Sequence, residues 1–248
     1  MILPQLSMDP LPAPRLAPPL AANQLEALCR LDGCTLANAI ETFQQRLRNE
    51  GFTDNSLRCV FSWLPPVAGY AVTIKIRGSA PPTAGTPYVD RTDWWDYVLS
   101  VPAPRIVVVQ DVATRPGLGS LLGAVHLNIL RALGCVGAVT NGAVRDLPAV
   151  QALGFQLFAG SVSVSHAYVH IIDVGQPVEV AGLRIHSGDL LHGDLHGVQT
   201  VPLAIAPEIP GVAARILQQD QALIDLCRSE EFSLARLRAA VHGRALTS

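Results

Sequence analysis

The chain has 248 residues, of which 49% are hydrophobic, 15% are charged and 5% are aromatic, and its formal net charge is -2. This composition allows one large domain or two small ones, with a core built mainly from Ala, Val, Leu and Ile. It excludes a basic nucleic-acid-binding segment, and no apolar run reaches the roughly 18 residues of a membrane span. A charged fraction below the typical value of about 25% indicates a surface partly covered by other subunits; an alanine-rich monomer is the alternative.

Residues 1–20 are rich in proline and are expected to form an extended N-terminal arm, since proline fixes φ and removes a backbone donor. The two alternatives for this arm are packing across a neighbouring subunit and free disorder. The segment lacks a basic stretch followed by a continuous apolar run, so it does not resemble a signal peptide. The chain has five cysteines and no C-x-x-C motif. They are interpreted as reduced, mostly buried thiols of a cytoplasmic protein.

Two helices are expected after the arm, and in the second of them Leu36, Ile40, Phe43 and Leu47 recur at helical spacing. Thr35 is a candidate N-cap for this helix, and Gly51 is a candidate C-terminal stop.

An alternation of strands and helices follows and predicts βαβ units with a parallel set of strands. The aromatic run at 93–97 is expected to begin a helix that docks through its rings, and the segment 77–90 is expected to be a loop. Strands are predicted over 67–76, 105–109, 136–140 and 155–159, and helices over 124–133 and 147–153.

The pattern changes after residue 160. Glycines separate three apolar, β-branched segments that are predicted to form hairpins rather than crossovers. The chain closes with two helical segments, so the whole is predicted to be a mixed α/β fold with a second β layer. The expected strands cover 162–174, 178–185 and 189–201, and the expected helices cover 209–227 and 232–241.

Arg145 and Asp146 follow the apolar strand at 136–140 and are the most informative pair in the chain. A guanidinium group donates hydrogen bonds in a fork that suits a carboxylate, and an aspartate suits a hard divalent ion. The pair therefore predicts a site for a small oxo-acid. The alternative is a simple helix start, with Asp146 as the N-cap and Pro148 in the first turn.

The glycine-bearing loop at 117–123 lies between another predicted strand and a helix. Backbone N–H groups at a helix start can hold an anion, although turns need glycines in any case. If the two strands are parallel, this loop and Arg145 meet at one edge of the sheet, where ligands of α/β proteins bind.

The histidines form a second group of candidates. His192 and His196 have a spacing that suits a metal on a helix, but Gly193 and Gly197 favour a hairpin turn. His166, Tyr168 and His170 alternate along a predicted strand, where they would form a subunit contact or a pocket wall. His126, His186 and His242 have no partner that the sequence reveals.

Nucleophilic catalysis and nucleotide binding are disfavoured. The chain has no G-x-S-x-G elbow around Ser161, Ser163 or Ser165, and it has neither G-x-x-x-x-G-K-[ST] nor G-x-G-x-x-G.

With these residues in view, the chain resembles the RraA-like family, which contains regulators of ribonuclease activity and 4-hydroxy-4-methyl-2-oxoglutarate aldolases, and whose members are often mislabelled demethylmenaquinone methyltransferases. The resemblance extends over about 25–205. The segments on which it depends are 117–123, 134–137, 141–146, 153–155, 158–159, 177–178, 188–189 and 197–198.

The resemblance implies an α-β-β sandwich with a mixed sheet and flanking helices, of the swivelling-domain type. It divides the chain into the arm 1–20, an α/β/β domain 21–206 and C-terminal helices 207–248. It also implies a homotrimer or a dimer of trimers (a homohexamer), with sites between subunits.

The resemblance further implies chemistry on a pyruvate-like keto acid with Mg²⁺ or Mn²⁺. By position, Asp146 would hold the metal, and Arg145 would bind substrate and stabilise the charge of the developing enolate. The carboxylate of the substrate would bind to the loop formed by Gly119, Ser120, Leu121 and Leu122. The expected reactions are retro-aldol cleavage and oxaloacetate decarboxylation, since both pass through pyruvate enolate.

Two positions depart from the family pattern. The aldolases usually have an acidic residue twenty-one positions before the arginine, and here that position (145 minus 21) is Ala124. A further acidic residue is usual three positions after the aspartate, and here it is Ala149. Methyl groups neither order water nor move protons. His126 is a candidate replacement, although its side chain leaves the helix in another direction.

Three readings follow. The first is a metal-dependent lyase acting on a 2-oxo acid, with a small-molecule substrate and no nucleic-acid or membrane partner. The second is a non-catalytic regulator on the same scaffold, which Ala124 and Ala149 favour. The third is another small-molecule reaction at the same site.

Overall fold

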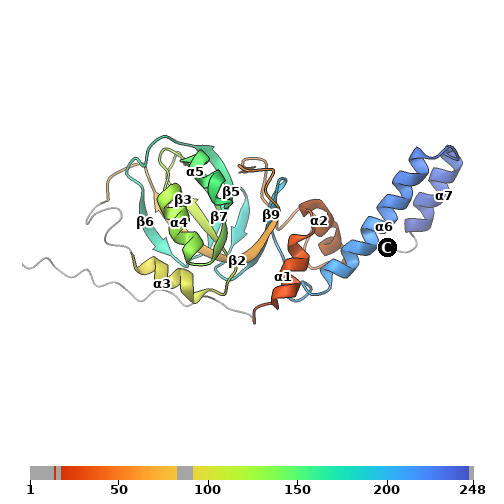
Figure 1. Cartoon of the computed structure of the whole chain (residues 1–248), viewed down its shortest axis with the longest axis horizontal. Helices are drawn as coiled ribbons and strands as arrows, with labels where there is room; N and C mark the ends of the chain where they lie inside the picture. The colour runs from red at the N-terminus through yellow and green to blue at the C-terminus, as the bar shows by residue number, and fades with distance from the viewer. Residues whose placement is uncertain (1–13, 15–17, 83–91, 246–248) are drawn as a thin grey trace, which may run out of the picture.

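A mixed β-sheet forms the centre of the computed structural model, which describes residues 14, 18–82 and 92–245 (Figure 1). The sheet has eight strands among these residues, in the order β1-β5-β4-β3-β2-β9-β10, and β6 also pairs with β2. The strands are β1 (Arg58–Cys59), β2 (Val67–Arg77), β3 (Arg105–Asp111), β4 (Cys135–Val144), β5 (Gln156–Val162), β6 (His170–Val174), β7 (Val178–Val180), β8 (Leu183–Ile185), β9 (Leu190–Asp194) and β10 (Gly197–Thr200).

Helices connect the parallel strands and flank the sheet. Each of α3, α4 and α5 joins two successive parallel strands, which confirms the predicted βαβ units. The helices are α1 (Ala22–Cys29), α2 (Gly33–Thr42), α3 (Asp93–Ser100), α4 (Ala124–Ala132), α5 (Leu147–Leu153), α6 (Ile209–Arg228) and α7 (Leu234–Ala245).

The two faces of the sheet are covered by different layers. In β3, Val107 and Val109 belong to the core that includes the helices, whereas Ile106 and Val108 belong to a second core. The β7–β8 hairpin closes that second core with Val178, Val180, Leu183 and Ile185. The strands are buried on both faces, which explains their continuous apolar sequences. This arrangement is the predicted α-β-β sandwich with a mixed sheet and flanking helices.

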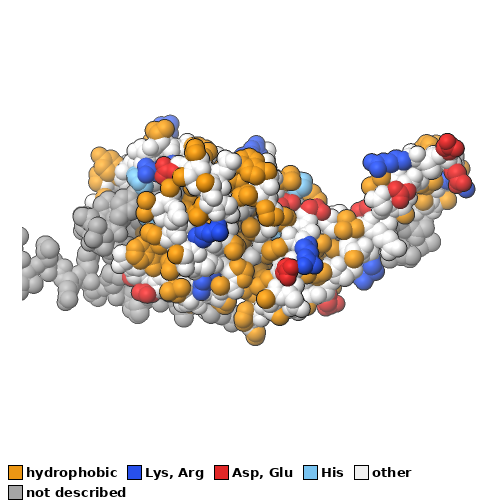
Figure 2. Space-filling view, viewed as in Figure 1, with side chains coloured by type: hydrophobic (Ala, Val, Ile, Leu, Met, Phe, Trp, Pro, Cys, Tyr) orange, Lys and Arg blue, Asp and Glu red, His pale blue; other side chains and the backbone are white. Residues whose placement is uncertain are grey.

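The last two helices extend away from the sheet (Figure 1). The first turns of α6 pack against α2 through the buried Ile209 and Ala213, and α7 returns along α6. On the face seen in Figure 2, uncharged side chains predominate over the body, and charged side chains gather on this projection. Within the described part of the chain, no helix has the length and hydropathy that a membrane crossing requires.

The predicted boundaries of the second helix are wrong at both ends. The N-cap of α2 is Asp32, whose carboxylate accepts the Thr35 N–H at 2.9 Å, so Thr35 lies inside the first turn. The helix stops at Thr42 rather than near Gly51, because Gln44 adopts a left-handed φ of 53°. Leu47 is therefore not part of the apolar stripe and is 64% exposed.

The predicted strand over 162–174 is also wrong. β5 ends at Val162 and β6 begins at His170, and Ala167 between them has a φ of 48°. The hydroxyl groups of Ser163 and Ser165 accept hydrogen bonds from nearby backbone amides and hold this loop. His166, Tyr168 and His170 therefore do not alternate along one strand.

The other two predicted segments fold back on themselves. The segment 178–185 is the β7–β8 hairpin, and 189–201 contains the β9–β10 hairpin. The turn of β7–β8 has φ values of 50° at Ala181 and 73° at Gly182, as a two-residue hairpin turn requires. Predictions for the arm 1–20 and for the loop 77–90 fall largely outside the described residues.

All five cysteines are free, but they are less buried than expected. Cys135 is buried, whereas Cys34 and Cys227 are exposed. The aromatic helix behaves as predicted, because α3 buries Trp94 and Tyr97 against the sheet.

Candidate functional site

The glycine-bearing loop lies against the end of β4, next to Arg145. Leu122 forms a parallel bridge with Val144, and the Arg145 N–H donates to the Leu122 carbonyl at 3.0 Å. β3 and β4 run parallel, so the loop that follows β3 and the residues that follow β4 meet at one edge of the sheet. The two features that the sequence singled out are therefore brought together.

Asp146 occupies the N-cap position of α5 but does not cap it. Its backbone is left-handed, with φ 58° and ψ 36°, and its side chain makes no capping hydrogen bond. Instead, Oδ2 accepts the Ala124 N–H at the start of α4, at 3.0 Å. The helix-start alternative is thus right about backbone position and wrong about the side chain. A non-glycine residue in this conformation costs of order 1–3 kcal/mol and is typical of functional sites.

The Asp146 carboxylate retains binding capacity. Within the described residues Oδ1 accepts no hydrogen bond, and the side chain is 39% exposed. Its position at the N-terminus of α4 favours negative charge there, because the first amides of a helix carry partial positive charge.

Arg145 holds its guanidinium next to this carboxylate. Its Nε is 3.5 Å from Asp146 Oδ2, and the side chain is 25% exposed. The Nε is buried, and among the described residues it has no hydrogen-bond acceptor. A buried donor without an acceptor costs about 1–3 kcal/mol, so the arrangement is suited to an acceptor that comes from outside the chain.

Gly123 allows these groups to come together. A Cβ atom at this position would lie 2.6 Å from Asp146 Oδ2 and 2.9 Å from Arg145 Nε. Its backbone φ is -125°, which any residue adopts. The glycine is therefore required by close approach rather than by its conformational freedom.

The predicted anion loop is packed against the segment that follows β5. A Cβ atom on Gly119 would lie 2.2 Å from the His166 carbonyl oxygen. The Ser120 N–H donates to the Ser165 carbonyl at 3.0 Å, so in this conformation that amide is engaged and does not face an anion. The Ser120 hydroxyl is buried and donates to the Leu122 carbonyl.

Two histidines lie in the region of the glycine-bearing loop and Arg145. His166 Nδ1 is 2.8 Å from the Ser120 carbonyl oxygen. Burial lowers the pKa of His126 below its ordinary value, and the positive charges of His166 and Arg145 lower it further. On the face seen in Figure 2, a group of side chains near α4 and α5 combines histidine, basic and acidic types. The sequence revealed neither contact, because the residues come from separate elements.

The two departures from the family pattern lie in the same region. Ala124 begins α4 and contributes its N–H to Asp146. Ala149 lies in α5 and donates its N–H to the Asp146 carbonyl. Neither position supplies a carboxylate.

Asp146 is the chain's candidate ligand for a divalent ion. The described residues contain no group of three or more His, Cys, Asp or Glu side chains that could hold a metal. Mg²⁺ is commonly bound by one or two carboxylates together with water and substrate oxygens. The open Asp146 oxygen, next to a guanidinium whose Nε has no acceptor among the described residues, fits that mode and does not fit a site made only from protein ligands.

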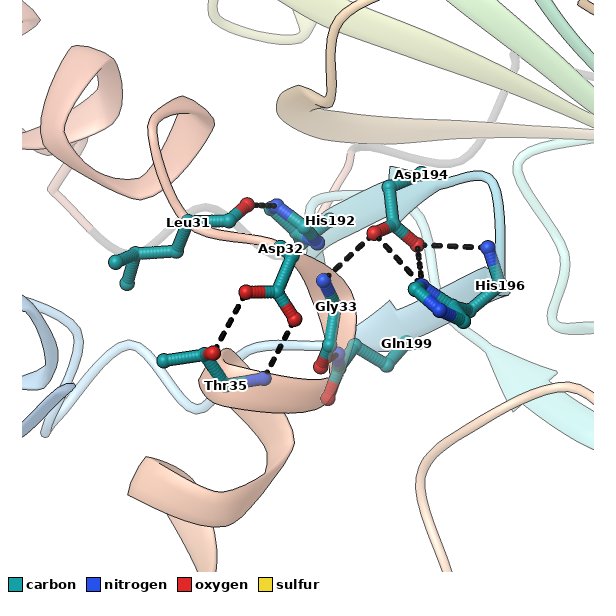
Figure 3. A network of polar contacts seen from close by, with 8 residues as sticks. All are labelled: Leu31, Asp32, Gly33, Thr35, His192, Asp194, His196 and Gln199. Atoms are coloured by element: carbon teal, nitrogen blue, oxygen red, sulfur yellow. Dashed lines mark hydrogen bonds and ion pairs between the residues drawn. The ribbon is translucent and has the colours of Figure 1, made fainter. Parts of the chain in front are cut away.

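The second histidine pair has a structural role. Asp194 accepts hydrogen bonds from the Gly33 N–H at 2.7 Å and the His196 N–H at 2.9 Å, and His196 Nδ1 lies 3.0 Å away (Figure 3). His192 Nε2 is 3.1 Å from the Leu31 carbonyl oxygen. These contacts join the β9–β10 hairpin to the start of α2. The hairpin interpretation of 192–196 is confirmed.

Comparison with known proteins agrees with this architecture. The family model described as RraA-like (Aldolase/RraA) matches residues 34–199. The chain therefore belongs to the RraA-like family.

Two relatives align with parts of the chain. A protein of Halalkalibacterium halodurans named "Putative 4-hydroxy-4-methyl-2-oxoglutarate aldolase" is 33% identical over 101 residues, which cover 40% of this chain. The chain spans about half of that relative, 48% of its length. The uncharacterized protein MJ0644 of Methanocaldococcus jannaschii is 23% identical over 63% of this chain and 71% of its own length.

Solved structures share the fold. An uncharacterized protein from Pseudomonas syringae has a TM-score of 0.66 at 22% identity, over 90% of this chain and 100% of its own. RraAS2 from Streptomyces coelicolor, described as an unusual member of the RNase ES inhibitor RraA protein family, has a TM-score of 0.63 at 20% identity. The matched region covers 82% of this chain and 96% of RraAS2.

Proposed function

We propose that this chain is a divalent-metal-dependent lyase that cleaves a 2-oxo acid through a pyruvate enolate. The observation that supports this most directly is the pairing at the end of β4. Asp146 is turned away from its own helix, and Arg145 Nε is buried beside it without an acceptor. Both features cost stability in the absence of a ligand. An anionic ligand would give Arg145 Nε an acceptor, and a cation would bind the open Asp146 oxygen.

The chemistry of each side chain suggests its role in this reaction. Asp146 would hold Mg²⁺ or Mn²⁺, which when bound supplies Lewis acidity toward the keto oxygen. Arg145 would bind the substrate carboxylate and stabilise negative charge as it develops. The loop formed by Gly119, Ser120, Leu121 and Leu122 would border the same carboxylate. Because the Ser120 amide is engaged, Arg145 would be the principal donor to the substrate.

The reaction breaks one carbon–carbon bond. With 4-hydroxy-4-methyl-2-oxoglutarate, the C3–C4 bond breaks, its electron pair enters the enolate, and the C4 hydroxyl loses a proton to become a ketone. With oxaloacetate, the bond to the departing carboxylate breaks and CO₂ leaves. In both cases protonation of the enolate carbon gives pyruvate, so one site serves both substrates.

We further propose that the chain works in the cytoplasm as a homo-oligomer, a trimer or a dimer of trimers. The partly exposed Asp146 carboxylate supports a site that a second copy completes. The low charged fraction of the chain is in keeping with covered surfaces.

A regulator without catalysis is the second candidate. Ala124 and Ala149 favour it, because each replaces a position where the aldolases have an acidic residue. The description of RraAS2 as a member of an RNase inhibitor family supports the same reading. The third candidate is a different small-molecule reaction at this site. An assay of pyruvate release distinguishes it from the lyase.

The test is pyruvate release by the full-length chain with Mg²⁺ or Mn²⁺ and a panel of 2-oxo acids that includes both substrates. We expect metal-dependent release that Arg145→Ala and Asp146→Ala both remove. Arg215→Ala, an exposed arginine on α6, is the matched control and should be unchanged. An absence of metal-dependent turnover across the panel would reject the lyase, and binding to a ribonuclease complex under the same conditions would favour the regulator.

A further inference from the structure

An apolar groove lies at the amino ends of the parallel strands, at the opposite end of the sheet from the Arg145–Asp146 pair. Its volume is about 530 Å³. Val67 lines it at the start of β2, Pro104 lines it just before β3, and Val136 lines it at the start of β4. α1 packs beside β2 and forms another wall (Figure 1). The groove is therefore separate from the candidate active site.

The side chains of this groove offer few hydrogen-bonding partners. Among the described residues that line it, Glu26 is the only charged one, and its carboxylate is paired with Arg30 at 2.5 Å. Apart from Glu26 and Cys29, the lining residues are proline, alanine, valine and leucine. A ligand that buried many polar groups here would leave them without partners, which is costly. The groove therefore suits an apolar ligand that has few hydrogen-bond donors.

The N-terminal arm of the chain has matching chemistry. Residues 10–19 have the sequence PLPAPRLAPP, in which five of ten residues are proline and Arg15 is the one charged residue. Proline has no backbone N–H, so this segment has half as many backbone donors to desolvate as an ordinary one. Leu11, Ala13 and Leu16 add apolar side chains. Such a segment is the kind of ligand that the groove suits.

The base of the arm lies at the groove. Pro19 and Leu20 form part of its wall. The Leu20 N–H donates to the hydroxyl of the buried Tyr70 at 2.7 Å, and Ala21 has an extended backbone with φ -64° and ψ 152°. Pro18 and Pro19 each fix φ and disfavour a helical conformation in the residue before them. The sequence therefore predicts that the chain before Leu20 leads away from the wall rather than folding back at once.

The reach of the arm is sufficient for contact with a second copy. At about 3.1 Å per residue, a proline-rich segment from 10 to 18 spans about 28 Å beyond Pro19. A folded chain of 248 residues has a radius of gyration of about 18 Å. Because each arm starts beside its own groove, two copies whose grooves face each other can exchange arms reciprocally, as a twofold contact requires.

We propose that the groove between α1 and the starts of β2, β3 and β4 holds residues 10–17 from the arm of a second copy of this chain. The groove supplies an apolar surface, and the proline-rich arm supplies an apolar segment with few donors. This inference does not depend on the lyase chemistry, because the groove and the Arg145–Asp146 pair lie at opposite ends of the parallel strands.

The test uses Cys29 as a reporter inside the groove. Cys29 lines the groove and is half-buried, whereas Cys34 and Cys227 are exposed. Two full-length variants are mixed under mild oxidation: one carries Leu11→Cys with Cys29→Ser, and the other keeps the wild-type arm and Cys29. Disulfides between the two chains are quantified by peptide mass spectrometry. The reaction is run in alkaline solution, because burial raises the pKa of the Cys29 thiol. A second mixture with Ala13→Cys in place of Leu11→Cys covers the neighbouring register.

We expect the cysteine in the arm to link to Cys29 at least about tenfold more than to Cys34 or Cys227, although random collision favours exposed thiols. Ala22→Asp, in the chain that carries Cys29, places a charge in the groove and should reduce this link at least about tenfold. An acidic residue suits the first turn of α1, so the helix is retained. Asn23→Asp, at an exposed neighbouring position that does not line the groove, is the matched control and should leave the link unchanged.

The other outcomes overturn the proposal. A chain with both Leu11→Cys and Cys29 that forms the disulfide only within itself, while the mixture forms none, shows that the chain's own arm fills the groove. Links without preference for Cys29, no link from either arm position, or a link that Ala22→Asp leaves intact each reject the groove as the binding site. Pyruvate release by the wild-type protein tests the lyase separately, so failure of one proposal is distinguishable from failure of the other.

Discussion

Asp146 and Asp194 each accept a hydrogen bond from the first backbone N–H of a helix, but their surroundings differ in how fully they satisfy the carboxylate. Asp194 has a side chain only 4% exposed and accepts hydrogen bonds from the Gly33 and His196 amides, with the His196 ring beside it. Asp146 accepts one hydrogen bond, from Ala124, and lies next to a guanidinium whose Nε has no acceptor in the described structure.

The difference separates a structural carboxylate from a binding one. The oxygens of Asp194 are used within the fold, where they join the β9–β10 hairpin to α2 (Figure 3). Asp146 keeps capacity that the fold does not use, and it does so in a strained backbone conformation. A carboxylate bound to the first amide of a helix is thus too coarse a criterion to identify a site, and unused hydrogen-bonding capacity is the better one.

The largest expected effect is on turnover at Asp146. Asp146→Asn keeps an oxygen for the Ala124 N–H and tolerates the left-handed backbone, but it removes the charge. We expect metal-dependent pyruvate release to fall on the order of a thousandfold, about 4 kcal/mol in the barrier. The metal-free unfolding free energy, from urea titration, should change by less than about 1 kcal/mol. Large destabilisation would mean that Asp146 is structural after all.

The opposite response is expected at Asp194. Asp194→Ala leaves the Gly33 and His196 amides without their acceptor, so the unfolding free energy should fall by about 2–4 kcal/mol. Metal affinity of the folded protein should not change. Asp225→Ala, an exposed α6 carboxylate bonded to Gln221, is the control and should alter stability by less than about 0.5 kcal/mol. If Asp146→Asn and Asp194→Ala have equal free energies of unfolding, the two carboxylates do not differ in the way proposed here.

Two glycine-to-alanine substitutions, one next to each aspartate, test the same contrast and should have smaller effects. A Cβ atom on Gly123 would meet Asp146 Oδ2 at 2.6 Å, and one on Gly33 would meet Asp194 Oδ1 at 2.7 Å. Gly123→Ala should weaken Mn²⁺ binding about tenfold, or 1.4 kcal/mol, with little loss of stability. Gly33→Ala should lower stability by about 1–3 kcal/mol and leave Mn²⁺ affinity unchanged. Calorimetry measures the Mn²⁺ affinity, and urea titration measures the free energy of unfolding. If the two glycine variants change both quantities equally, the contrast between Asp146 and Asp194 is contradicted.

The smallest expected effect is a pH dependence. Burial alone would raise the pKa of Asp194, but the hydrogen bonds from Gly33 and His196 outweigh it and hold the pKa below the ordinary value of an aspartate. Stability from this carboxylate is therefore complete above about pH 5 and is lost as the pH falls through the lowered pKa. The stability difference between wild type and Asp194→Ala should be constant from about pH 5 to 7 and shrink in more acid solution. A difference that grows on acidification would contradict this origin.

Much of the fold could be predicted because the segments carry local signals. The β-branched runs of β2, β3 and β4 are buried on both faces, and the helices between them follow at the expected places. The failures also have local causes. Ser163 and Ser165 occur in a strand-like sequence, but their hydroxyl groups bind the nearby backbone and end the strand.

The candidate site was only partly readable in the sequence. Arg145, Asp146 and the glycine loop stand out because each adjoins a strand end, and the parallel sheet brings them together. His126 lies close enough to His166 and Arg145 for both to lower its pKa, and the three residues come from separate elements, so no periodicity reveals this proximity. The close approach at Gly123 is likewise a property of the folded chain.

The most direct test is Mn²⁺ binding followed by electron paramagnetic resonance, with and without oxalate, on wild type, Asp146→Asn and Arg145→Ala. We expect wild type to bind Mn²⁺ and to bind it more tightly with oxalate. Arg145→Ala should keep Mn²⁺ affinity but lose the effect of oxalate, and Asp146→Asn should lose Mn²⁺ binding. Undiminished Mn²⁺ binding by Asp146→Asn would contradict the assignment of this site.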